Sequence, residues 1–515
     1  NKLYQRGFQA GRTNYFLTDP NYWTLNTGDP GGVSNTGGSP TERHLSSYFG
    51  RLDYNYNDKY ILSGTLRRDA SSVFAPDQQV GYFPSISAGW RISKETFFSS
   101  VSFVNDLKLR GGWGKAGSIS NINPTNAYTL FASGVGYSWY PLDGDPNSST
   151  QGFYPSQIGN LQTTWEQDVT SNIGLDALIL NNKVEFSIDW YKKEIKGLLF
   201  RPDNSLGAMA GGATPAFING GNIENKGIDA NVIYHATIGR DFKLDISGNI
   251  TSYKSKVVSL PGDKIYYDEY SAGSSRIGAF SRAQVGQPIG AFFGYKVIGL
   301  FQSADDVSKS PTQDAAKAGR FKYADINNDG KITDSDRTFF GNPNPKFTYG
   351  FTLNATYKNF DFSIFLYGSA GNDVINYVKY WTDFPQVFRG NVSKDAVYNS
   401  WTTSNPNAKV PILETNGNFS NSGVFNSYYM ENGSYLRCKS LSVGYTVAPS
   451  ILKNIGVDKL RVYLQAANLF TITKYTGLDP ELQGSDLGNN SNFGIDFGNY
   501  PANQKNYNIG VSLTF

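Results

Sequence analysis

The most constraining feature of the sequence is a pair of alternating segments within residues 346–371, joined by a short turn at Lys358 and Asn359. One face of the first segment is apolar and carries Tyr349, Phe351, Leu353, Ala355 and Tyr357. The opposite face is small or polar and carries Thr348, Gly350, Thr352, Asn354 and Thr356. After the turn the alternation resumes from Phe360 to Tyr367, with Phe365 as a departure from it. Strict alternation with period two predicts a β-hairpin.

The length of this hairpin distinguishes between two kinds of β protein. Each arm has about ten residues, which is what a tilted strand needs to cross a bilayer. The apolar face begins and ends in aromatic residues, as expected where a lipid-facing strand meets the two membrane interfaces. A strand of a soluble sandwich also alternates, but it averages about half this length, and its outer face is seldom so uniformly small and polar. The hairpin therefore favours an all-β, transmembrane antiparallel β-barrel over a soluble sandwich.

The composition agrees with a barrel and argues against several other classes. Aromatic residues make up 15% of the 515 residues, yet the mean hydropathy is −0.40. No run approaches the roughly eighteen apolar residues of a spanning helix, whereas half of every barrel strand is polar. The single cysteine, Cys438, excludes an internal disulfide, and the two histidines argue against an imidazole metal cluster. A formal net charge of +3 gives no reason to expect nucleic acid as a partner.

Alternating segments recur along the whole chain. Besides the hairpin they are 46–56, 60–66, 83–93, 107–115, 165–180, 184–191, 224–238, 244–251, 435–447, 460–470 and 507–515. This pattern predicts about thirteen strands whose connections are short and long by turns, as in barrels with tight periplasmic turns and long outer loops. The long loops are expected at about 118–163, 255–345, 371–434 and 471–504, and residues 1–42, which show no period, are expected to be an exposed loop.

The number of strands indicates that the barrel is larger than this chain. Bacterial single-chain barrels close with an even number of strands, so an odd count makes residues 1–515 the C-terminal part of a larger barrel. The last segment ends on Phe515, and we expect it to be a membrane strand. Nothing near Asn1 reads as a signal peptide, which suggests an internal start.

Several motifs, in order along most of the chain, are similar to those of a known family. They are Tyr48-Phe49-Gly50-Arg51, Thr65-Leu66-Arg67-Arg68-Asp69, Tyr82-Phe83-Pro84-Ser85 with Gly89-Trp90, Asn222-Ile223-Glu224-Asn225-Lys226-Gly227, Phe293-Gly294-Tyr295, Asp325 to Ile332, Gly341 to Phe347, Tyr435-Leu436-Arg437, Asn468-Leu469-Phe470 and Tyr475 to Pro480. The chain thereby resembles the TonB-dependent transporters of the SusC/RagA type found in Bacteroidetes.

The resemblance implies an outer-membrane barrel with a plug domain, energised through TonB and covered by a SusD-like surface lipoprotein. Plugged transporters have about 22 strands, so about nine would lie outside this chain. The plug and the TonB-binding segment are absent from these 515 residues. Energy coupling and the lipoprotein partner therefore rest on the resemblance alone.

One motif has the spacing of a calcium-binding loop. Residues 325–336 read D-I-N-N-D-G-K-I-T-D-S-D, with oxygen donors in the order expected of an EF-hand and Gly330 at the sharp turn. The expected ligands are Asp325, Asn327, Asp329, the carbonyl of Lys331, and Asp336, which stands where a glutamate is usual. The alternative is a solvated turn rich in Asp and Asn. We expect a structural calcium ion that holds a long outer loop.

Aromatic residues in the long connections are candidates for contact with a substrate. They are Trp139, Tyr140, Tyr154, Trp381, Phe384 and Trp401, and they could equally pack the loops or meet the partner lipoprotein. Of the strand carboxylates, Glu185, Asp189, Asp245 and Asp361 are expected on a solvated, hydrogen-bonded inner wall.

The sequence therefore predicts an importer rather than an enzyme. It contains no phosphate-binding Gly-Lys-Ser/Thr run, no Gly-x-Ser-x-Gly elbow and no H-E-x-x-H helix. We expect active import of oligosaccharides or peptides across the outer membrane. The alternatives are a TonB-dependent receptor for a metal chelate, without a lipoprotein lid, and a passive porin or structural barrel.

Overall fold

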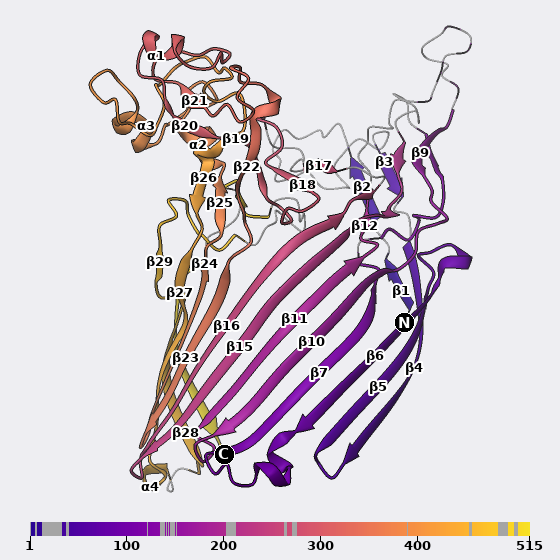
Figure 1. Cartoon of the computed structure of the whole chain (residues 1–515), viewed down its shortest axis with the longest axis vertical. Coiled ribbons are helices and arrows are strands. Elements are labelled where there is room, and N and C mark those ends of the chain that lie inside the picture. The colour runs from indigo at the N-terminus through magenta and orange to yellow at the C-terminus, as the bar shows by residue number, and fades with distance from the viewer. Residues whose placement is uncertain are drawn as a thin grey trace.

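The computed structural model describes residues 2–5, 8–12, 33–37, 41–120, 122–133, 138, 140, 142, 144, 150, 152–201, 213–261, 265–269, 276–388, 390–452, 456–482, 493–498 and 503–515. Its main element is one antiparallel sheet of fifteen strands (Figure 1). Along this sheet the strands follow each other in sequence order, as in a meander. Within the described ranges no helix has the length and apolar character needed to cross a membrane.

The long strands of this sheet, which we call the wall, run side by side with a common tilt (Figure 1). They are β4 (Thr41–Tyr56), β5 (Tyr60–Ser71), β6 (Val80–Arg91), β7 (Val104–Ser118), β10 (Glu166–Ile179), β11 (Val184–Lys196), β15 (Asn222–Ile238), β16 (Phe242–Ser259), β23 (Phe347–Tyr357), β24 (Phe360–Ala370), β27 (Tyr435–Thr446), β28 (Lys459–Ala467) and β31 (Asn506–Thr514). Every segment predicted from alternation lies largely within one of these strands, so the predicted fold class is confirmed. The total of about 22 strands in a complete barrel stays a prediction.

The prediction for the first residues was wrong. Residues 1–42 were expected to be an exposed loop, but they contain β1 (Lys2–Gln5), β2 (Phe8–Arg12), β3 (Val33–Gly37) and the start of β4. β1 joins the wall beside β4, and β2 pairs with β3. Strand pairing uses backbone N–H and C=O groups, so it can form in a segment whose side chains show no period.

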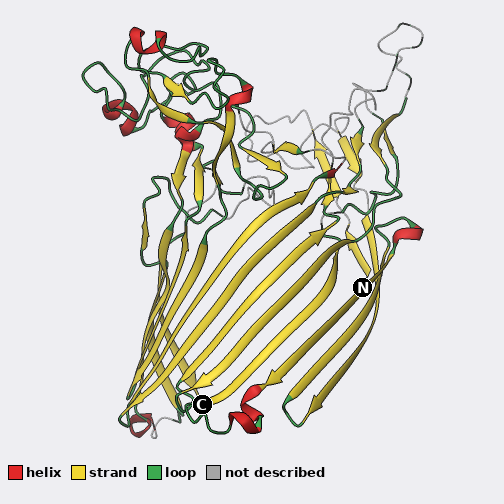
Figure 2. Ribbon diagram, viewed as in Figure 1, coloured by secondary structure: helices red, strands yellow, loops and turns green. Residues whose placement is uncertain are grey.

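The turns explain why one end of the wall is compact. Asn57 and Asp58 both have φ of 54°, and Asn181 and Asn182 have φ of 56° and 63°. Tight hairpin turns favour residues that tolerate positive φ, Asn and Asp among them. Short connections of this kind gather at one end of the wall, and the long connections gather at the other (Figure 2). The long connections occupy residues 119–165, 197–221, 260–346, 371–434 and 468–505 between the wall strands.

Most remaining elements belong to the long connections. The strands are β8 (Leu130–Ala132), β9 (Tyr154–Ile158), β12 (Leu199–Phe200), β13 (Thr214–Pro215), β14 (Ile218–Asn219), β17 (Tyr266–Glu269), β18 (Ser281–Gln284), β19 (Phe292–Tyr295), β20 (Val297–Leu300), β21 (Phe321–Tyr323), β22 (Arg337–Gly341), β25 (Asp373–Asn376), β26 (Met430–Asn432), β29 (Thr471–Thr473) and β30 (Ile495–Asp496). The helices are α1 (Ala304–Ser308), α2 (Val378–Thr382), α3 (Lys394–Asn399) and, at the compact end, α4 (Pro449–Leu452), with 3-10 turns at Pro76–Gln78, Ile92–Lys94, Thr96–Phe98, Asp334–Asp336 and Ser427–Tyr429.

Three of the long connections fold together beyond the end of the wall (Figure 1). We call residues 276–341, 371–434 and 493–498 the loop unit. It has an aromatic core that includes Phe280, Phe292, Tyr295, Phe321, Tyr323, Tyr377, Phe384, Trp401, Phe425, Tyr429 and Ile495. β30 pairs in parallel with β25, and β25 pairs with β26. The long loops are therefore packed structure rather than solvated chain.

The wall has an apolar face and a polar face. Large apolar side chains stand exposed along the strands, among them Leu52 at 76%, Ile173 at 59% and Ile509 at 79% of full exposure. Soluble monomers rarely expose so extended an apolar surface. A bilayer would cover it, with the other face left to water.

Candidate functional site

The polar face of the wall is organised by ion pairs that cross from strand to strand. Arg110 of β7 donates from Nε to Asp176 of β10 at 3.0 Å, and from Nη1 to Asp189 of β11 at 2.6 Å. Gly174 lies between Arg110 and Asp189 on the same rung of the sheet. A Cβ atom at Gly174 would overlap Asp189 Oδ1 and would lie 2.8 Å from Cζ of Arg110. Glycine is therefore required for the guanidinium to pass over β10.

A similar arrangement occurs farther along the sheet. Arg461 of β28 donates from Nε and Nη2 to the carboxylate of Asp361 on β24, at 2.9 and 2.6 Å. Between them, on β27, is Gly444, where a Cβ would lie 2.5 Å from both side chains. Two ion pairs thus each span a central strand that carries glycine. In both cases the ion-paired side chains occupy the space directly above the glycine, which gives the polar face charges in fixed positions.

The remaining carboxylates predicted for the inner wall meet at a histidine. His235 of β15 lies with Nδ1 2.5 Å from Asp245 Oδ1 and with Nε2 3.3 Å from Glu185 Oε1. With Asp189 and Asp361 in their arginine pairs, all four predicted carboxylates are hydrogen-bonded on the wall. Ion-paired and partly solvated groups of this kind suit the lining of an aqueous passage.

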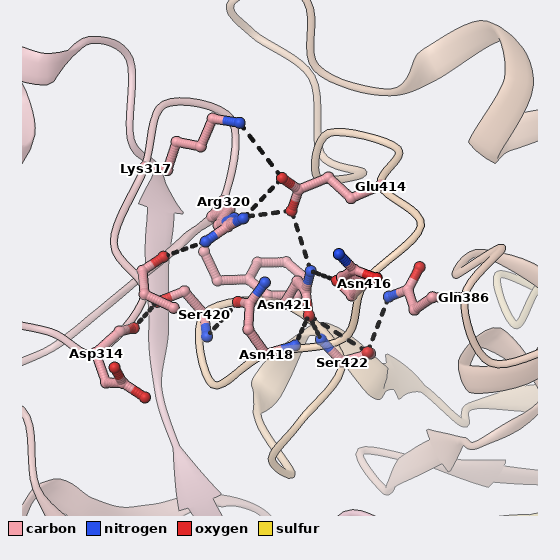
Figure 3. A network of polar contacts seen from close by, with 12 residues as sticks. Asp314, Lys317, Arg320, Gln386, Glu414, Asn416, Asn418, Ser420, Asn421 and Ser422 are labelled. Atoms are coloured by element: carbon pink, nitrogen blue, oxygen red, sulfur yellow. Dashed lines mark hydrogen bonds and ion pairs between the residues drawn. The ribbon is translucent and has the colours of Figure 1, made fainter.

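The loop unit is held together by a second polar network, shown in Figure 3. Arg320 binds both carboxylate oxygens of Glu414, at 2.7 and 2.8 Å, and Lys317 lies 3.6 Å from the same group. Asn421 donates to Glu414 at 3.1 Å, and Ser420 donates to the carbonyl of Asp314 at 2.5 Å. Burial raises the pKa of Glu414, but Arg320, Asn421 and Lys317 together lower it more, so the pKa is below its usual value. The network fastens one long connection to the next.

Three of the predicted substrate-contacting rings lie in the loop unit. Phe384 and Trp401 are 2% and 6% exposed and belong to its core, and Trp401 donates from Nε1 to Gln302 at 3.1 Å. Trp381 is partly exposed, packs against the same core and lies under the Arg276 guanidinium at 4.9 Å. For Phe384 and Trp401 the structure thus shows the loop-packing alternative that the sequence left open.

The other three rings belong to the connection between β7 and β10. Tyr140 is 62% exposed and forms an isolated bridge with Thr150. Tyr154 begins β9 and is partly exposed. Trp139 lies outside the described residues. The five described rings therefore lie on two different long connections, with Tyr140 and Tyr154 on one and Trp381, Phe384 and Trp401 on the other.

The predicted calcium loop has part of the expected geometry. Gly330 has φ of +79°, and Asp325 accepts hydrogen bonds from the amides of Gly330 at 2.9 Å and Asp329 at 3.3 Å. Asn327 and Asp329 are exposed on the same turn. Their oxygens are the hard donors that calcium prefers. Asn327 and Asp329 also accept backbone hydrogen bonds, from the amides of Asp329 at 3.0 Å and Lys331 at 2.8 Å, so this half of the loop is a hydrogen-bonded turn.

The last expected ligand is engaged elsewhere. Asp336 is fully buried, and its carboxylate accepts from the amides of Ile326 at 2.9 Å and Thr333 at 2.8 Å. Burial raises its pKa, but these backbone N–H groups lower it more, so Asp336 is an ionised cap. Among the described residues no group of three His, Cys, Asp or Glu side chains is placed to hold a metal ion. Asp325, Asn327, Asp329 and the Lys331 carbonyl are the donors that remain.

Comparison with known proteins identifies the family to which this wall belongs. Residues 2–469 match the family described as "TonB dependent receptor-like, beta-barrel". The chain belongs to that family. This TonB-dependent receptor barrel is a protein of the outer membrane, and its family consists of receptors and transporters rather than enzymes.

Curated relatives of this receptor barrel share its sequence along nearly the whole chain. It is 31% identical over 533 residues to TonB-dependent receptor P3 of Formosa agariphila, covering 100% of this chain and 50% of that protein. It is 33% identical over 487 residues to TonB-dependent receptor SusC of Bacteroides thetaiotaomicron, covering 92% of this chain and 44% of SusC. The chain thus spans about half the length of the curated relatives it matches.

Solved structures show the same fold. The structure titled "Structure of the RagAB peptide transporter" superposes with a TM-score of 0.80 at 23% identity, over 97% of this chain and 50% of that one. The RagAB peptide importer in its "closed-closed" state gives a TM-score of 0.80 at 22% identity, over 100% and 52%. The resemblance to the SusC/RagA type is therefore confirmed.

The receptor barrel also contains a buried ion cluster that sequence reasoning missed. Arg437, at the start of β27, donates to Asp479 at 2.6 Å, to Thr471 at 2.8 Å and to Glu481. The side chains of Arg437 and Asp479 are each 3% exposed. Asn503 donates to Asp479 from its backbone at 2.8 Å. Both charged residues lie in motifs that carried the family resemblance, but nothing local indicates that they pair.

Proposed function

We propose that the complete protein is an outer-membrane active importer of oligosaccharides or peptides, driven by TonB and covered by a SusD-like lipoprotein. The observation that supports this most is the fold shared with the RagAB peptide transporter over 97% of the chain. In this barrel the wall, whose polar face carries ion pairs, extends below the packed loop unit; Figure 2 shows the arrangement of the two in ribbon form. Such a unit provides a rigid surface for a partner, and the polar face provides a wetted route.

Uptake measurements test the function directly. A strain lacking the gene is expected to lose uptake of an oligosaccharide or oligopeptide on which the parent strain grows, and deletion of tonB should abolish the same uptake. Growth unaffected by both deletions on every oligosaccharide and peptide mixture tested would refute active import of these substrates.

The protein components of the purified complex distinguish the proposed importer from a receptor for a metal chelate. Extraction from the outer membrane in mild detergent is expected to recover a large lipoprotein in equal molar amount. A receptor purified alone, whose uptake responds only to iron limitation, would instead support the chelate alternative. Passive permeation through a porin would persist without TonB.

We also propose that exposed rings of the loops contact the substrate. Tyr140, Tyr154 and Trp381 retain accessible surface, and an aromatic ring offers a flat apolar face at low entropic cost. Of the other rings expected from the sequence, Trp139 lies outside the described residues, and Phe384 and Trp401 are buried in the aromatic core, so the proposal rests on the three exposed rings. Tyr140→Ala is expected to weaken substrate binding, with Tyr398→Ala as the control because Tyr398 is a similarly exposed tyrosine on α3. Equal effects of both changes would contradict a specific contact.

Calcium at residues 325–331 is a further part of the proposal. Asp325, Asn327, Asp329 and the Lys331 carbonyl would hold the ion, which would supply positive charge to an otherwise acidic turn. Terbium luminescence should report binding that Asp325→Ala abolishes and that Asp305→Ala, on α1, leaves intact. Chelator should raise protease cleavage near residue 331 in the wild type. No terbium signal at millimolar metal would overturn the site.

A further inference from the structure

Six lysines extend the apolar face of the wall toward the long connections. Ile173 of β10, Trp190 of β11 and Ile228 of β15 lie opposite one another on adjacent strands, and all three are exposed on that face. Because side chains two positions apart on a strand share a face, the next residues on this face follow from the register. They include the group that we call the lysine patch: Lys115 of β7, Lys192 and Lys196 of β11, Lys226 of β15, and Lys254 and Lys256 of β16.

Two carboxylates, Glu194 of β11 and Glu224 of β15, lie among these lysines. Lys192 forms ion pairs with Glu194 at 3.0 Å and with Glu224 at 3.2 Å. Glu224 also pairs with Lys226 at 2.8 Å. These contacts between side chains of two strands confirm that the charged residues share one face. They also show that both carboxylates are already used within the patch.

The other lysines of the patch lack this compensation. Lys115, Lys254 and Lys256 form no ion pair with any residue that the structure describes. Lys226 stands directly opposite Lys192 on one side and Lys254 on the other. Like charges directly opposite each other on adjacent strands are destabilising. Three ammonium groups in one row therefore favour an anion from outside the chain.

The position of the lysine patch along the wall corresponds to the level of lipid head groups. Side chains two positions apart on a strand are separated by about 7 Å, and Lys192 follows Trp190 at this interval. Trp113 of β7 lies in the same row as Lys192, across Ser171 of β10. Tryptophan is enriched where a bilayer meets water. The long connections, which outer-membrane barrels direct to the outside, gather at this end of the wall (Figure 2). The patch therefore faces the outer leaflet.

We propose that the lysine patch binds the phosphate head group of a lipid in the outer leaflet, whose acyl chains lie against the apolar face beside it. Ammonium groups bind phosphate as point charges. Attraction of basic residues to an anionic lipid adds to the burial of apolar surface. One lipid can make both contacts because Ile173, Trp190 and Ile228 adjoin the patch. The inference is separate from the proposed import, since it concerns the membrane around the barrel rather than the cargo.

Native mass spectrometry of the purified full-length protein in detergent tests the proposal. The probes are lipid A, the same lipid after removal of its phosphate groups, and inorganic phosphate. Lipid A is expected to bind at least about tenfold more tightly than its dephosphorylated form, since each lysine near the phosphate should raise the affinity about fivefold. Added salt should weaken this binding. Inorganic phosphate in large excess should not displace the lipid, because it makes no apolar contact.

Three outcomes would overturn the proposal. Equal binding of the two lipid forms would show that only the acyl chains contact the wall. Displacement of lipid A by inorganic phosphate would show that the patch takes up a free anion rather than a lipid. Absence of any bound lipid A would remove the site altogether.

Variants locate the site on the wall. Lys254→Gln should weaken lipid A binding about fivefold, and adding Lys256→Gln should weaken it about fivefold again. Lys254→Arg keeps the charge and should bind as the wild type does. The matched control is Lys193→Gln, because Lys193 lies at the same level of β11 but on the polar face, where it pairs with Asp168 at 3.2 Å. Heat-modifiable migration on SDS gels should confirm that these variants fold. If Lys254→Gln and Lys193→Gln have the same effect, the lysine patch is not the site.

Discussion

Replacing Arg437 by methionine should open the last long connection, residues 468–505. Methionine keeps much of the arginine side-chain length but removes the charge and all the donors. It leaves Asp479, at 3% exposure, and Glu481, at 20%, without the guanidinium that joins them. The two carboxylates then keep neutral donors from Asn503, and the one cation left to them is Lys439, which pairs with Glu481 at 2.6 Å.

The expected cost follows from the burial of the pair. Removing one partner of a buried ion pair typically destabilises by about 3–5 kcal/mol, because the other charge is left uncompensated. At about 1.36 kcal/mol per tenfold change, the open population of the connection should rise by roughly a hundred- to a few thousandfold. Arg437→Lys should recover only part of this loss, since an ammonium group cannot reach Thr471, Asp479 and Glu481 as a guanidinium fork does.

Trypsin provides a specific assay for this opening. The sequence has no lysine or arginine between Lys474 and Lys505, so cleavage after these residues reports on the connection. Tyr475, which follows Lys474, is 6% exposed, and its burial protects the bond in the closed state. When opening is fast relative to cleavage, the rate follows the open population. A double variant with Asp479→Leu should cleave more slowly than Arg437→Met alone.

The reasoning would be refuted if Arg437→Met accelerated cleavage after Lys474 by less than about fivefold, which corresponds to about 1 kcal/mol. An exposed ion pair would give such a value. Cleavage at other tryptic sites should stay unchanged, and a general increase would mean that the barrel itself was disturbed.

Three further outcomes are expected. Gly174→Ala should impair folding of the wall, measured by heat-modifiable migration on SDS gels, whereas Gly50→Ala should not, because a Cβ at Gly50 meets nothing within 4 Å. Trp401→Ala should lower the stability of the loop unit by about 3–5 kcal/mol by near-UV circular dichroism, whereas Phe388→Ala, at a side chain 56% exposed, should have little effect. Burial raises the pKa of Asp479, but backbone N–H groups and Arg437 lower it below its usual value. The stability that ionised Asp479 contributes should therefore be present above about pH 4 and be lost at lower pH, and hydrogen exchange corrected for intrinsic rates would measure this loss.

The wall could be predicted from sequence because the residues that define each strand and turn are neighbours in the chain. Alternation from Thr348 to Tyr357 specifies which face of a strand meets lipid, and the residues at the Asn57 and Asn181 turns specify where the strand reverses. The strands at the start of the chain could not be predicted in this way. β1, for example, is held by backbone pairing with β4 and shows no side-chain period.

The interior of the loop unit could not be predicted because its contacts are not local. Phe384 and Trp401 lie in a connection, and from sequence a loop position suggests exposure. Their burial depends on partners such as Phe321 from another connection. Similarly, Arg437 and Asp479 are 42 positions apart, and no spacing rule joins them.

The aromatic core is built from several connections, and we expect it to form after the wall strands that separate them. Its residues come from the connections before β23, after β24 and after β28, so wall strands separate them in the sequence. Contacts between such distant segments carry a large loop-closure cost until something else brings the segments together. Here the neighbouring wall strands do so, and the core can consolidate only after they are paired. A barrel that stalls with β23 to β28 unpaired would leave these rings exposed, and would therefore aggregate through the part of the protein that lies outside the membrane.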